Sequence, residues 1–318
     1  MVCMIIRKKA VGMYGKKPED RTIKELLESG IINLDKPAGP TSHLTVQYVK
    51  DILNVKKAGH SGTLDPKVTG ILPIGINNGT KVLQALLKSD KTYVCLMHVH
   101  KDIKEAKIKK VFKRFKGEIE QIPPLRSNVR RIKRKRMIYS LKILEIKDRD
   151  ILFIVSCQAG TYVRKLVHDI GKELGIGANM QELRRIKTGP FTEQNAVILQ
   201  DLSDVMEKYK QGKEKHLRKY IQPVESAIKH LRKIWVLDPT VDSLCYGAKL
   251  KVPGISKLEE GIEKGDTVAI LTLKEELIIL GKAEMNSKEM KTKKKGVACS
   301  ILRVIMERGT YPNLWKKK

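Results

Sequence analysis

Residues 59–66 read Gly-His-Ser-Gly-Thr-Leu-Asp-Pro, the densest cluster of small, turn-prone and polar residues in the chain. Its two glycines allow the backbone to approach another group closely. Pro66 disfavours the helical region for the residue before it, so the Asp65 carboxylate is presented from an extended loop. That position suits a reactive group. The alternative is an Asx-type turn between two elements, because Asp-Pro pairs are common in turns.

A second cluster, Gly-Thr-Tyr-Val-Arg at residues 160–164, lies between a strand expected to end at Cys157 and an expected helix. Loops at such junctions often carry function. If the Arg164 guanidinium meets Asp65, the charge-assisted contact keeps the carboxylate ionised near neutral pH. Taken alone, Arg164 is more often a solvated helix residue or a phosphate contact. Lys91 and Tyr93 share one face of a further expected strand, where a lone tyrosine is usually part of the core.

The hydrophobic pattern around these clusters predicts an α+β fold. Thr41 or Ser42 caps a helix whose apolar residues follow a short strand at 31–34 and a turn at 37–40. A tight polar turn at 147–150 makes at least one hairpin antiparallel. This pattern does not fit a doubly wound sheet. Further strands are expected at 92–99, 137–146 and 151–157, and helices at 105–116, 161–174, 180–186 and 201–209.

The length of 318 residues favours one large domain and a smaller one. Residues 1–29 are basic and read as an extension that packs on another unit, and residues 30–225 form the larger domain. Beyond a boundary near residue 230, residues 231–307 read as a mainly β unit with strands at 234–237, 267–273 and 277–283, followed by a basic tail at 308–318.

The charge balance points to a polyanionic partner. The chain has 64 Lys and Arg against 35 Asp and Glu, a formal net charge of +29, and nucleic acid is the first candidate. Apolar stretches such as 151–155 and 277–280 are far below the roughly 18 residues of a spanning helix, so integral membrane classes are excluded, and no secretory signal is seen. Five scattered cysteines fit a reduced cytoplasm. No metal site is expected, because His98 and His100 lack a third nearby ligand.

Residues 126–136 hold seven arginines or lysines in eleven positions. A charge run is usually a solvated face, but at this density in so basic a chain we expect a strip that contacts phosphates through Arg126, Arg130, Arg131 and Arg134. The aromatic content of 5% argues against a long stacking platform for single strands. Recognition should therefore rest mostly on backbone and shape.

Five stretches, in family order, resemble the motifs of the TruB family of RNA pseudouridine synthases. They are the first motif at 30–43, the catalytic loop at 59–73, the tyrosine motif at 91–93, the arginine motif at 159–164 and the closing motif at 183–191. Residues 121–124, 180–183, 235–255 and 311–315 are similar to the archaeal and dyskerin branch. The resemblance covers roughly residues 20–318 and implies a catalytic domain with a mixed, mainly antiparallel sheet flanked by helices, plus a small β-rich PUA domain on which the extension at 1–29 is expected to pack.

This resemblance implies an isomerase that converts uridine to pseudouridine without a cofactor. Members of the branch are catalytic subunits of H/ACA guide-RNA particles with three small proteins, and some modify the tRNA T-loop without a guide. The expected substrates are therefore the tRNA T-loop uridine at position 55, rRNA, or both. Lys249 and Lys251, beside the Gly247-Ala248 turn, are expected to hold guide RNA.

The resemblance also assigns roles to single residues. Asp65 is the essential aspartate, Tyr93 stacks on the flipped base, Arg164 pairs with Asp65, Leu183 lines the pocket and His60 helps displace the target base. Lys36 is placed with the substrate-binding residues. Its expected role there is to order the first motif and not to take part in the chemical step. A non-catalytic RNA scaffold would explain the charge but leave Asp65, Tyr93 and Arg164 without a purpose, and no phosphate-binding loop of the Gly-x-x-x-x-Gly-Lys type is present.

Overall fold

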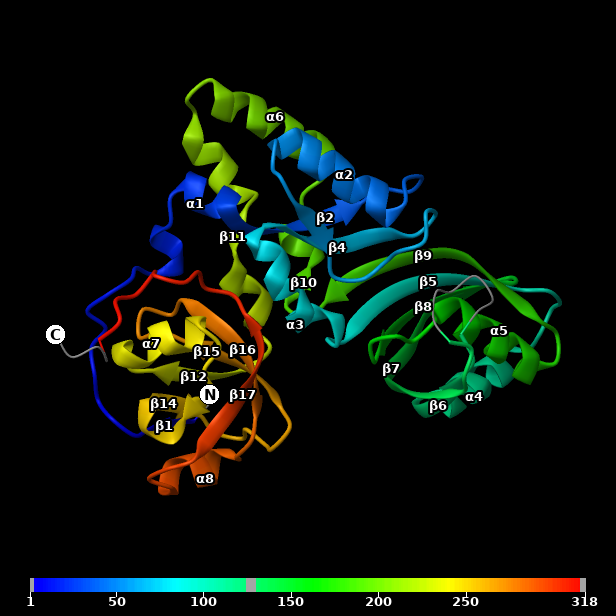
Figure 1. The fold of residues 1–318 in the computed structure, drawn as a ribbon. Coiled ribbons are helices and arrows are strands. Elements are labelled where there is room, and N and C mark those ends of the chain that lie inside the picture. Colours follow the sequence, from blue (N-terminus) through cyan, green and yellow to red (C-terminus); the bar gives the residue numbers. More distant parts are fainter. Residues whose placement is uncertain (1–2, 124–129, 315–318) are drawn as a thin grey trace.

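Two β-sheets organise the molecule, as the computed structural model shows for residues 3–123 and 130–314 (Figure 1). Among the named strands of the larger sheet in these described residues, β4–β9 is the only parallel pair, so the expected mixed, mainly antiparallel sheet is confirmed. Its order is β11 (Gln222–Pro223), β2 (Ser29–Lys36), β4 (Thr69–Asn77), β9 (Ala178–Thr188), β5 (Lys91–Val99), β8 (Asp150–Cys157), β7 (Arg134–Lys147) and β6 (Gly117–Gln121), with β3 (Ala58–His60) on β4 and β10 (Phe191–Thr192) on β9.

The joint between β4 and β9 is short. Only Thr69 with Arg184 and Gly70 with Arg185 are paired across it, whereas β2 and β4 pair over eight positions. Gly70 has φ +103°, and a Cβ there would lie 2.2 Å from the Arg185 carbonyl oxygen, so the close approach of the strands requires glycine. The loop that carries Asp65 enters β4 at this joint.

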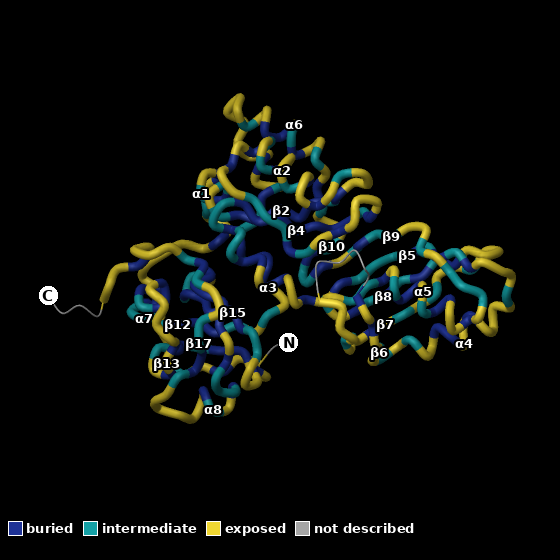
Figure 2. Tube along the Cα trace, turned by 45° about the vertical axis from the view of Figure 1, so that its right-hand side comes forward, coloured by how far each residue is buried: buried dark blue, intermediate teal, exposed yellow. Residues whose placement is uncertain are grey.

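Helices cover the two halves of the larger sheet separately. α2 (Ser42–Leu53) and α6 (Leu199–Lys210) lie side by side against β2 and β4, while α4 (Glu105–Arg114) and α5 (Val163–Leu174) pack on the β5–β8–β7 half (Figure 1). Burial is concentrated where helices face strands, and the outer helix faces are exposed (Figure 2). Each fully buried aliphatic side chain contributes about 1.5–3 kcal/mol, so these two apolar layers hold the sheet.

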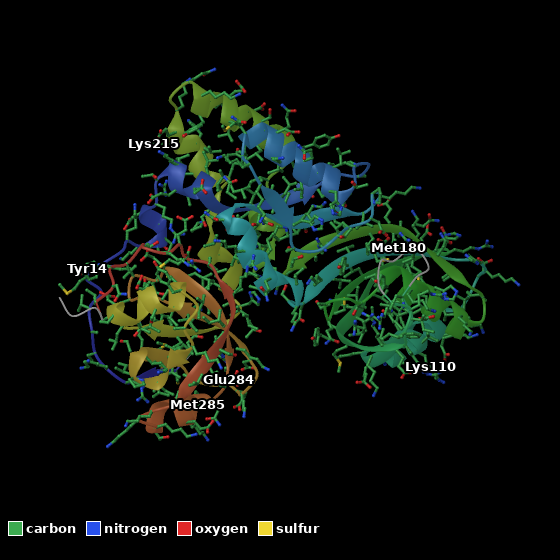
Figure 3. All side chains as sticks on the ribbon, viewed as in Figure 1. Tyr14, Lys110, Met180, Lys215, Glu284 and Met285 are labelled. Carbon is green, nitrogen blue, oxygen red and sulfur yellow. The ribbon has the colours of Figure 1, made fainter. Side chains whose placement is uncertain are left out.

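Most of the expected elements are confirmed, but the helix expected at 180–186 is wrong. That stretch belongs to strand β9, and Figure 3 shows Met180 near the end of β9 that points away from the smaller sheet. Met180, Leu183 and Ile186 are spaced like a helix face, but the backbone pairs with β5 along nine positions. Tertiary pairing has overridden the local pattern. The expected hairpin turn is confirmed, because Lys147 of β7 pairs with Asp150 of β8.

The second sheet forms the smaller unit, and the strands expected at 234–237, 267–273 and 277–283 are confirmed as β12, β15 and β16. Its seven strands run in the order β1 (Met4–Ile6), β14 (Ile255–Glu259), β12 (Arg232–Val236), β15 (Thr267–Leu271), β16 (Leu277–Ala283), β17 (Val297–Val304) and β13 (Leu250–Lys251). The remaining short elements are α1 (Ile23–Glu28), α3 (Gln84–Leu87), α7 (Asp238–Cys245), α8 (Ser287–Thr292) and the 3-10 helices η1 (Pro18–Asp20), η2 (Asn78–Leu83), η3 (Glu193–Asn195), η4 (Glu214–Lys219), η5 (Val224–Ile228) and η6 (Val252–Gly254).

Both ends of the chain are tied into this architecture. β1 pairs with β14, and Arg7 donates to backbone carbonyls at the end of α8. The α1 helix instead buries Ile23 and Leu26 against the larger sheet. Near the other end, the buried Tyr311 hydroxyl donates to the Glu276 carboxylate at 2.7 Å. An apolar cluster that includes Ile31, Ile71, Trp235, Leu280 and Ile305 joins the two sheets.

Candidate active site

The catalytic loop at 59–73 is anchored on both sides of Asp65. On one side, the Ser42 hydroxyl accepts from the Leu64 amide at 2.8 Å and donates to the Leu64 carbonyl at 2.9 Å. The sequence left Thr41 and Ser42 as alternative helix caps. Thr41 caps α2, which frees Ser42 to hold the loop. The neighbouring Leu64 side chain is buried, whereas Asp65 is exposed.

On the other side of Asp65, the loop is held by the side chain of Lys36. Its ammonium donates to the carbonyls of Pro37, Pro66 and Val68 at 2.7, 3.0 and 3.0 Å. The side chain has no exposed surface, and burial lowers its pKa, an effect that the nearby Asp65 carboxylate opposes. All three ammonium protons are used, so Lys36 orders the first motif and the catalytic loop and has no donor left for a substrate.

Asp65 and Arg164 meet, as the sequence suggested. The Arg164 guanidinium forms a hydrogen-bonded ion pair with the Asp65 carboxylate across 99 residues of chain. Both side chains are more than half exposed, at 56% for Arg164 and 54% for Asp65. An ion pair this exposed adds at most about 1 kcal/mol to stability. Its importance is therefore orientation of the carboxylate.

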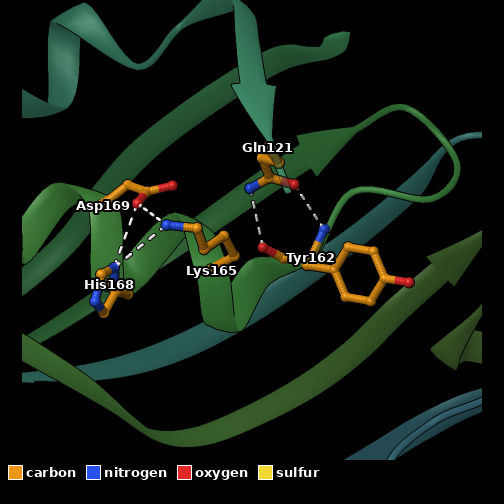
Figure 4. Close-up of polar contacts among 5 residues, drawn as sticks. All are labelled: Gln121, Tyr162, Lys165, His168 and Asp169. Carbon is orange, nitrogen blue, oxygen red and sulfur yellow. Dashed lines mark hydrogen bonds and ion pairs between the residues drawn. The ribbon is translucent and has the colours of Figure 1, made fainter. Parts of the chain in front are cut away.

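Gln121 fixes the start of the helix that carries Arg164. Its side-chain carbonyl accepts from the Tyr162 amide at 3.0 Å, and its amide donates to the Tyr162 carbonyl at 3.1 Å (Figure 4). One turn further along α5, Lys165 bonds to Asp169 and His168 (Figure 4). Gln121 is buried at the end of β6, so this strand holds the backbone at Tyr162, two residues before Arg164.

Tyr93 and Leu183 lie on neighbouring strands of the same sheet. Leu183 of β9 pairs with Cys95 of β5, two residues beyond Tyr93. Both side chains are partly buried and pack against the apolar layers on each half of the sheet. Burial raises the pKa of the Tyr93 phenol, while the Arg185 guanidinium acts in the opposite direction. The phenol is therefore neutral at physiological pH.

His60, at the end of β3 and the start of the catalytic loop, is neutral as well. Burial first, and then His43 and Arg185, lower its pKa to about 4. The Gly62 amide lies 3.2 Å from Nδ1 of His60, so this nitrogen accepts and the ring proton belongs on Nε2. The His43 ring stands edge-on to it, with 5.2 Å between ring centroids. His60 therefore offers a donor and an uncharged ring face.

The described charges of the basic run, at residues 130–136, differ in their surroundings. Lys133 and Lys135 form ion pairs with Glu120 and Glu118 of β6. On the other face of β7, the Arg136 guanidinium lies against Gly160, just before α5. Arg126 lies outside the described residues. Arg130 and Arg131 are exposed, and Arg134 is half-buried and donates to the Arg130 carbonyl at 3.2 Å.

The smaller sheet carries a second group of candidate residues. Lys249 and Lys251 are exposed beside the turn at Gly247, which has φ +96°. The sequence did not indicate the cavity next to this turn. It has a volume of about 390 Å³, and the Arg308 guanidinium stands 5.0 Å from the centre of the Tyr246 ring at its wall. Lys81 of η2 in the larger unit also lines it.

The two histidines, one in β5 and one just after it, bond to polar side chains of neighbouring strands. His98 pairs with Asp150 at 2.7 Å, and His100 bonds to Asn179 at 3.1 Å. Across residues 3–123 and 130–314, no three or more His, Cys, Asp and Glu side chains are grouped so that they could hold a metal ion. In the same ranges, no helix combines the length and apolar character needed to cross a membrane.

Sequence reasoning missed Ser42 and Gln121 as supports of the site. Their contacts join residues 22 and 41 positions apart, and neither residue type signals such a contact in the sequence. The register of a strand against its neighbours decides which distant backbone each side chain meets. The pairing of Asp65 with Arg164, in contrast, was anticipated from the sequence, and the structure confirms that the two side chains meet.

Family models match along the chain. The TruB family pseudouridylate synthase N-terminal domain matches residues 50–103 and 99–163, and the tRNA pseudouridylate synthase B C-terminal domain matches 164–229. The PUA domain matches residues 232–305, and the DKCLD (NUC011) domain matches residues 3–46.

Similar proteins span almost the whole chain. A probable tRNA pseudouridine synthase B of Nanoarchaeum equitans is 55% identical, covering 95% of this chain and 87% of its own length, and that of Pyrococcus furiosus is 53% identical, covering 96% and 90%. A crystal structure of a Cbf5-Nop10-Gar1 complex matches with 50% identity and a TM-score of 0.95, covering 99% of this chain and 97% of the other. An H/ACA RNP bound to a substrate RNA containing 2'-deoxyuridine matches with 48% identity and a TM-score of 0.92, covering 99% and 98%. The chain therefore belongs to the TruB family of pseudouridine synthases, isomerases that act on uridine in RNA, and it carries a PUA domain.

Proposed function

We propose that this protein isomerises uridines both in the T-loop of tRNA, at position 55, and in rRNA, where it acts as the catalytic subunit of an H/ACA guide-RNA particle. The observation that carries the proposal is the pairing of Asp65 with Arg164 on an anchored loop beside Tyr93 and Leu183. The similar tRNA synthases and the similar H/ACA complexes support the two classes of target.

In the proposed reaction the N1–C1′ bond of uridine breaks, the base turns, and a C5–C1′ bond forms. The proton on C5 leaves and N1 gains a proton, so the composition is unchanged and no cofactor is required. Asp65 adds to the base or assists departure of uracil from the sugar, and both paths need a carboxylate at this position. Arg164 holds that carboxylate in place.

The other site residues prepare the base. The target uridine leaves its stack so that C1′ and the base are both reachable, which costs a few kcal/mol. Tyr93 stacks on the flipped base, Leu183 lines the pocket, and His60 helps displace the base as a neutral ring. The partly buried positions of Tyr93 and Leu183 support these roles, because an apolar wall with little water favours a flat base.

RNA is anchored at two further places. We assign residues 1–29 to an extension, 30–225 to the catalytic domain, 231–307 to the PUA domain and 308–318 to a tail. Lys249 and Lys251 hold guide RNA on the PUA domain, and Arg126, Arg130, Arg131 and Arg134 contact phosphates beside the catalytic domain. The exposure of Arg130, Arg131, Lys249 and Lys251 supports these assignments, since phosphate contacts need accessible charges.

Guide RNA and three small proteins complete the proposed particle. Similarity to chains solved with Nop10 and with Gar1 supports the protein partners, and similarity to the H/ACA RNP supports the guide. We place the protein in the cytoplasm. Its free cysteines, four of the five buried, are consistent with a reducing compartment.

The test is tritium release from C5-labelled uridine in tRNA and in rRNA fragments, with and without guide RNA and partner proteins. We expect release from tRNA by the protein alone and release from rRNA only in the presence of guide and partners. Absence of release from tRNA under both conditions removes the T-loop target. Equal release from rRNA with and without guide removes the guide-directed role.

A further inference from the structure

Arg185 is a buried cation that the reaction described above does not use. Its side chain is 2% exposed. Nε donates to the Ile71 carbonyl at 2.7 Å, and a terminal nitrogen donates to the Gly62 carbonyl at 3.1 Å. The other terminal nitrogen also faces the loop, 3.8 Å from where a Cβ on Gly62 would be. The guanidinium therefore joins strand β4 to the catalytic loop.

The preceding residue on β9 provides a contrast. Arg184 is more exposed and forms ion pairs with Asp35 and Glu193. For Arg185, no carboxylate in residues 3–123 or 130–314 lies within ion-pair distance. A buried charge without a counter-charge costs free energy that backbone carbonyls offset only in part. A site that keeps such a charge beside reacting groups is a candidate for function.

The third neighbour of Arg185 is Tyr93. The two residues are directly opposite each other on the antiparallel strands β9 and β5, which brings their side chains to the same side of the sheet. Arg185 also belongs to the β4–β9 joint, where Gly70 packs against its backbone. The Arg185 side chain thus lies against three parts of the site. These are Gly62 in the loop before Asp65, Ile71 in the strand after Asp65, and Tyr93 on the neighbouring strand.

We propose that Arg185 is a positioning residue for the isomerisation, fixing the catalytic loop and its Asp65 relative to Tyr93. The proposal rests on the proposed function. Lys36 and Ser42 hold the loop to the β2–α2 side of the sheet, whereas Arg185 ties the loop backbone to the β9–β5 side and Arg164 on α5 pairs with the Asp65 carboxylate. Without Arg185, the loop backbone loses its side-chain anchor to the strand that carries Leu183, and the alignment of Asp65 with Tyr93 depends on Arg164 alone.

The first test compares Arg185→Gln with the matched control Arg184→Gln in single-turnover assays at saturating tRNA. We expect Arg185→Gln to lower the rate constant by about 100-fold, as a displacement of about 1 Å at a reacting group does. The dissociation constant for tRNA should stay within about threefold, because a side chain 2% exposed contacts little RNA. Arg184→Gln should keep the rate within about threefold and lose thermal stability instead. Equal rates for the two variants, or a loss confined to RNA affinity, overturn the proposal.

A second measurement does not depend on activity. The Arg185 charge contributes to the low pKa of His60, so an NMR titration of the His60 ring in the free protein should show a higher pKa in Arg185→Gln and an unchanged one in Arg184→Gln. An unchanged His60 pKa in Arg185→Gln places the guanidinium away from the loop and overturns the proposal. If wild type releases no tritium while His60 responds as expected, the proposed function fails and the geometry stands.

If Arg185→Gln does not fold, the Arg185→Lys variant tests the positioning role in its place. Lysine keeps the charge but cannot donate to both the Ile71 and Gly62 carbonyls with the same geometry. We expect a folded Arg185→Lys protein with a rate about tenfold below wild type and unchanged tRNA affinity. A wild-type rate in Arg185→Lys overturns the positioning role.

Discussion

The catalytic loop and the basic strip at residues 130–136 both present charges to solvent, but they are supported differently. Asp65 is exposed above a loop held by Lys36 and Ser42, and its partner Arg164 stands on a helix whose start is held by Gln121. In the strip, Arg130 and Arg131 are exposed, and the ion pairs of Lys133 and Lys135 are at the surface. Chemistry needs one fixed position, whereas phosphate contact needs only a charge within reach, so the two regions should respond differently to substitution.

The largest expected effect is at Asp65. Asp65→Asn and Asp65→Ala should abolish tritium release, since no other carboxylate replaces the one on the loop, while the thermal midpoint stays nearly unchanged because the side chain is exposed. The midpoint by calorimetry is the control. Activity within tenfold of wild type in either variant would remove Asp65 from the mechanism.

Arg164→Met should be the next most severe. The substitution leaves the Asp65 carboxylate without its partner, and we expect a decrease of about 100-fold in single-turnover rate, comparable to the effect of removing one preorganised hydrogen bond at a reacting group. Arg164→Lys tests whether a positive charge without the guanidinium geometry is enough to orient the Asp65 carboxylate. If Arg164→Met retains the full rate, the ion pair does not orient the carboxylate for catalysis.

Two substitutions of Tyr93 distinguish the contribution of ring stacking to the rate from that of the phenolic hydroxyl. Tyr93→Phe keeps the ring and should lower the rate by about tenfold or less, whereas Tyr93→Leu removes the stacking surface, which is worth about 1–3 kcal/mol per base, and should lower it further. Rates at saturating tRNA for both variants give the order. The reverse order would make the phenolic hydroxyl the required group.

The basic strip should affect affinity and leave the rate intact. Replacing Arg130, Arg131 and Arg134 together by alanine should flatten the dependence of RNA affinity on salt, by about 0.7 in the log–log slope for each phosphate of a single strand that the protein no longer neutralises. Filter binding between about 50 and 200 mM salt, the range over which phosphate-dependent affinity changes steeply, measures it. A triple variant with an unchanged slope would show that the strip faces solvent or a protein partner.

The smallest effect is expected on the PUA domain. Lys249→Ala and Lys251→Ala should each weaken guide RNA binding several-fold, because each removes an exposed charge, and leave turnover at saturating RNA unchanged. Lys288→Ala, an exposed lysine on α8 away from the Gly247 turn, serves as control. Unchanged affinity in both test variants would falsify the assignment of this face to RNA.

The sequence anticipated the meeting of Asp65 and Arg164 but not the residues that support it. Asp65 before a proline and Arg164 at a strand-to-helix junction stand out locally, while their roles rest on the resemblance to the family motifs, and the alternating strands and amphipathic helices indicated the α+β class. β9 was misread because its apolar spacing fits a helix when its partner β5 is ignored. Ser42, Gln121 and Arg185 act on backbone atoms of distant segments, which no local pattern encodes.

The pairing of β1 with β14 has a consequence for synthesis of the chain. Met4–Ile6 are synthesised about 250 residues before their partners at Lys257–Glu259. At roughly 5–20 residues per second, this edge strand waits for about 13 to 50 seconds while the catalytic domain is completed. A substitution that weakens β1 would therefore act on a sheet that is completed late, and its cost would appear as slower folding of the second sheet in newly made protein.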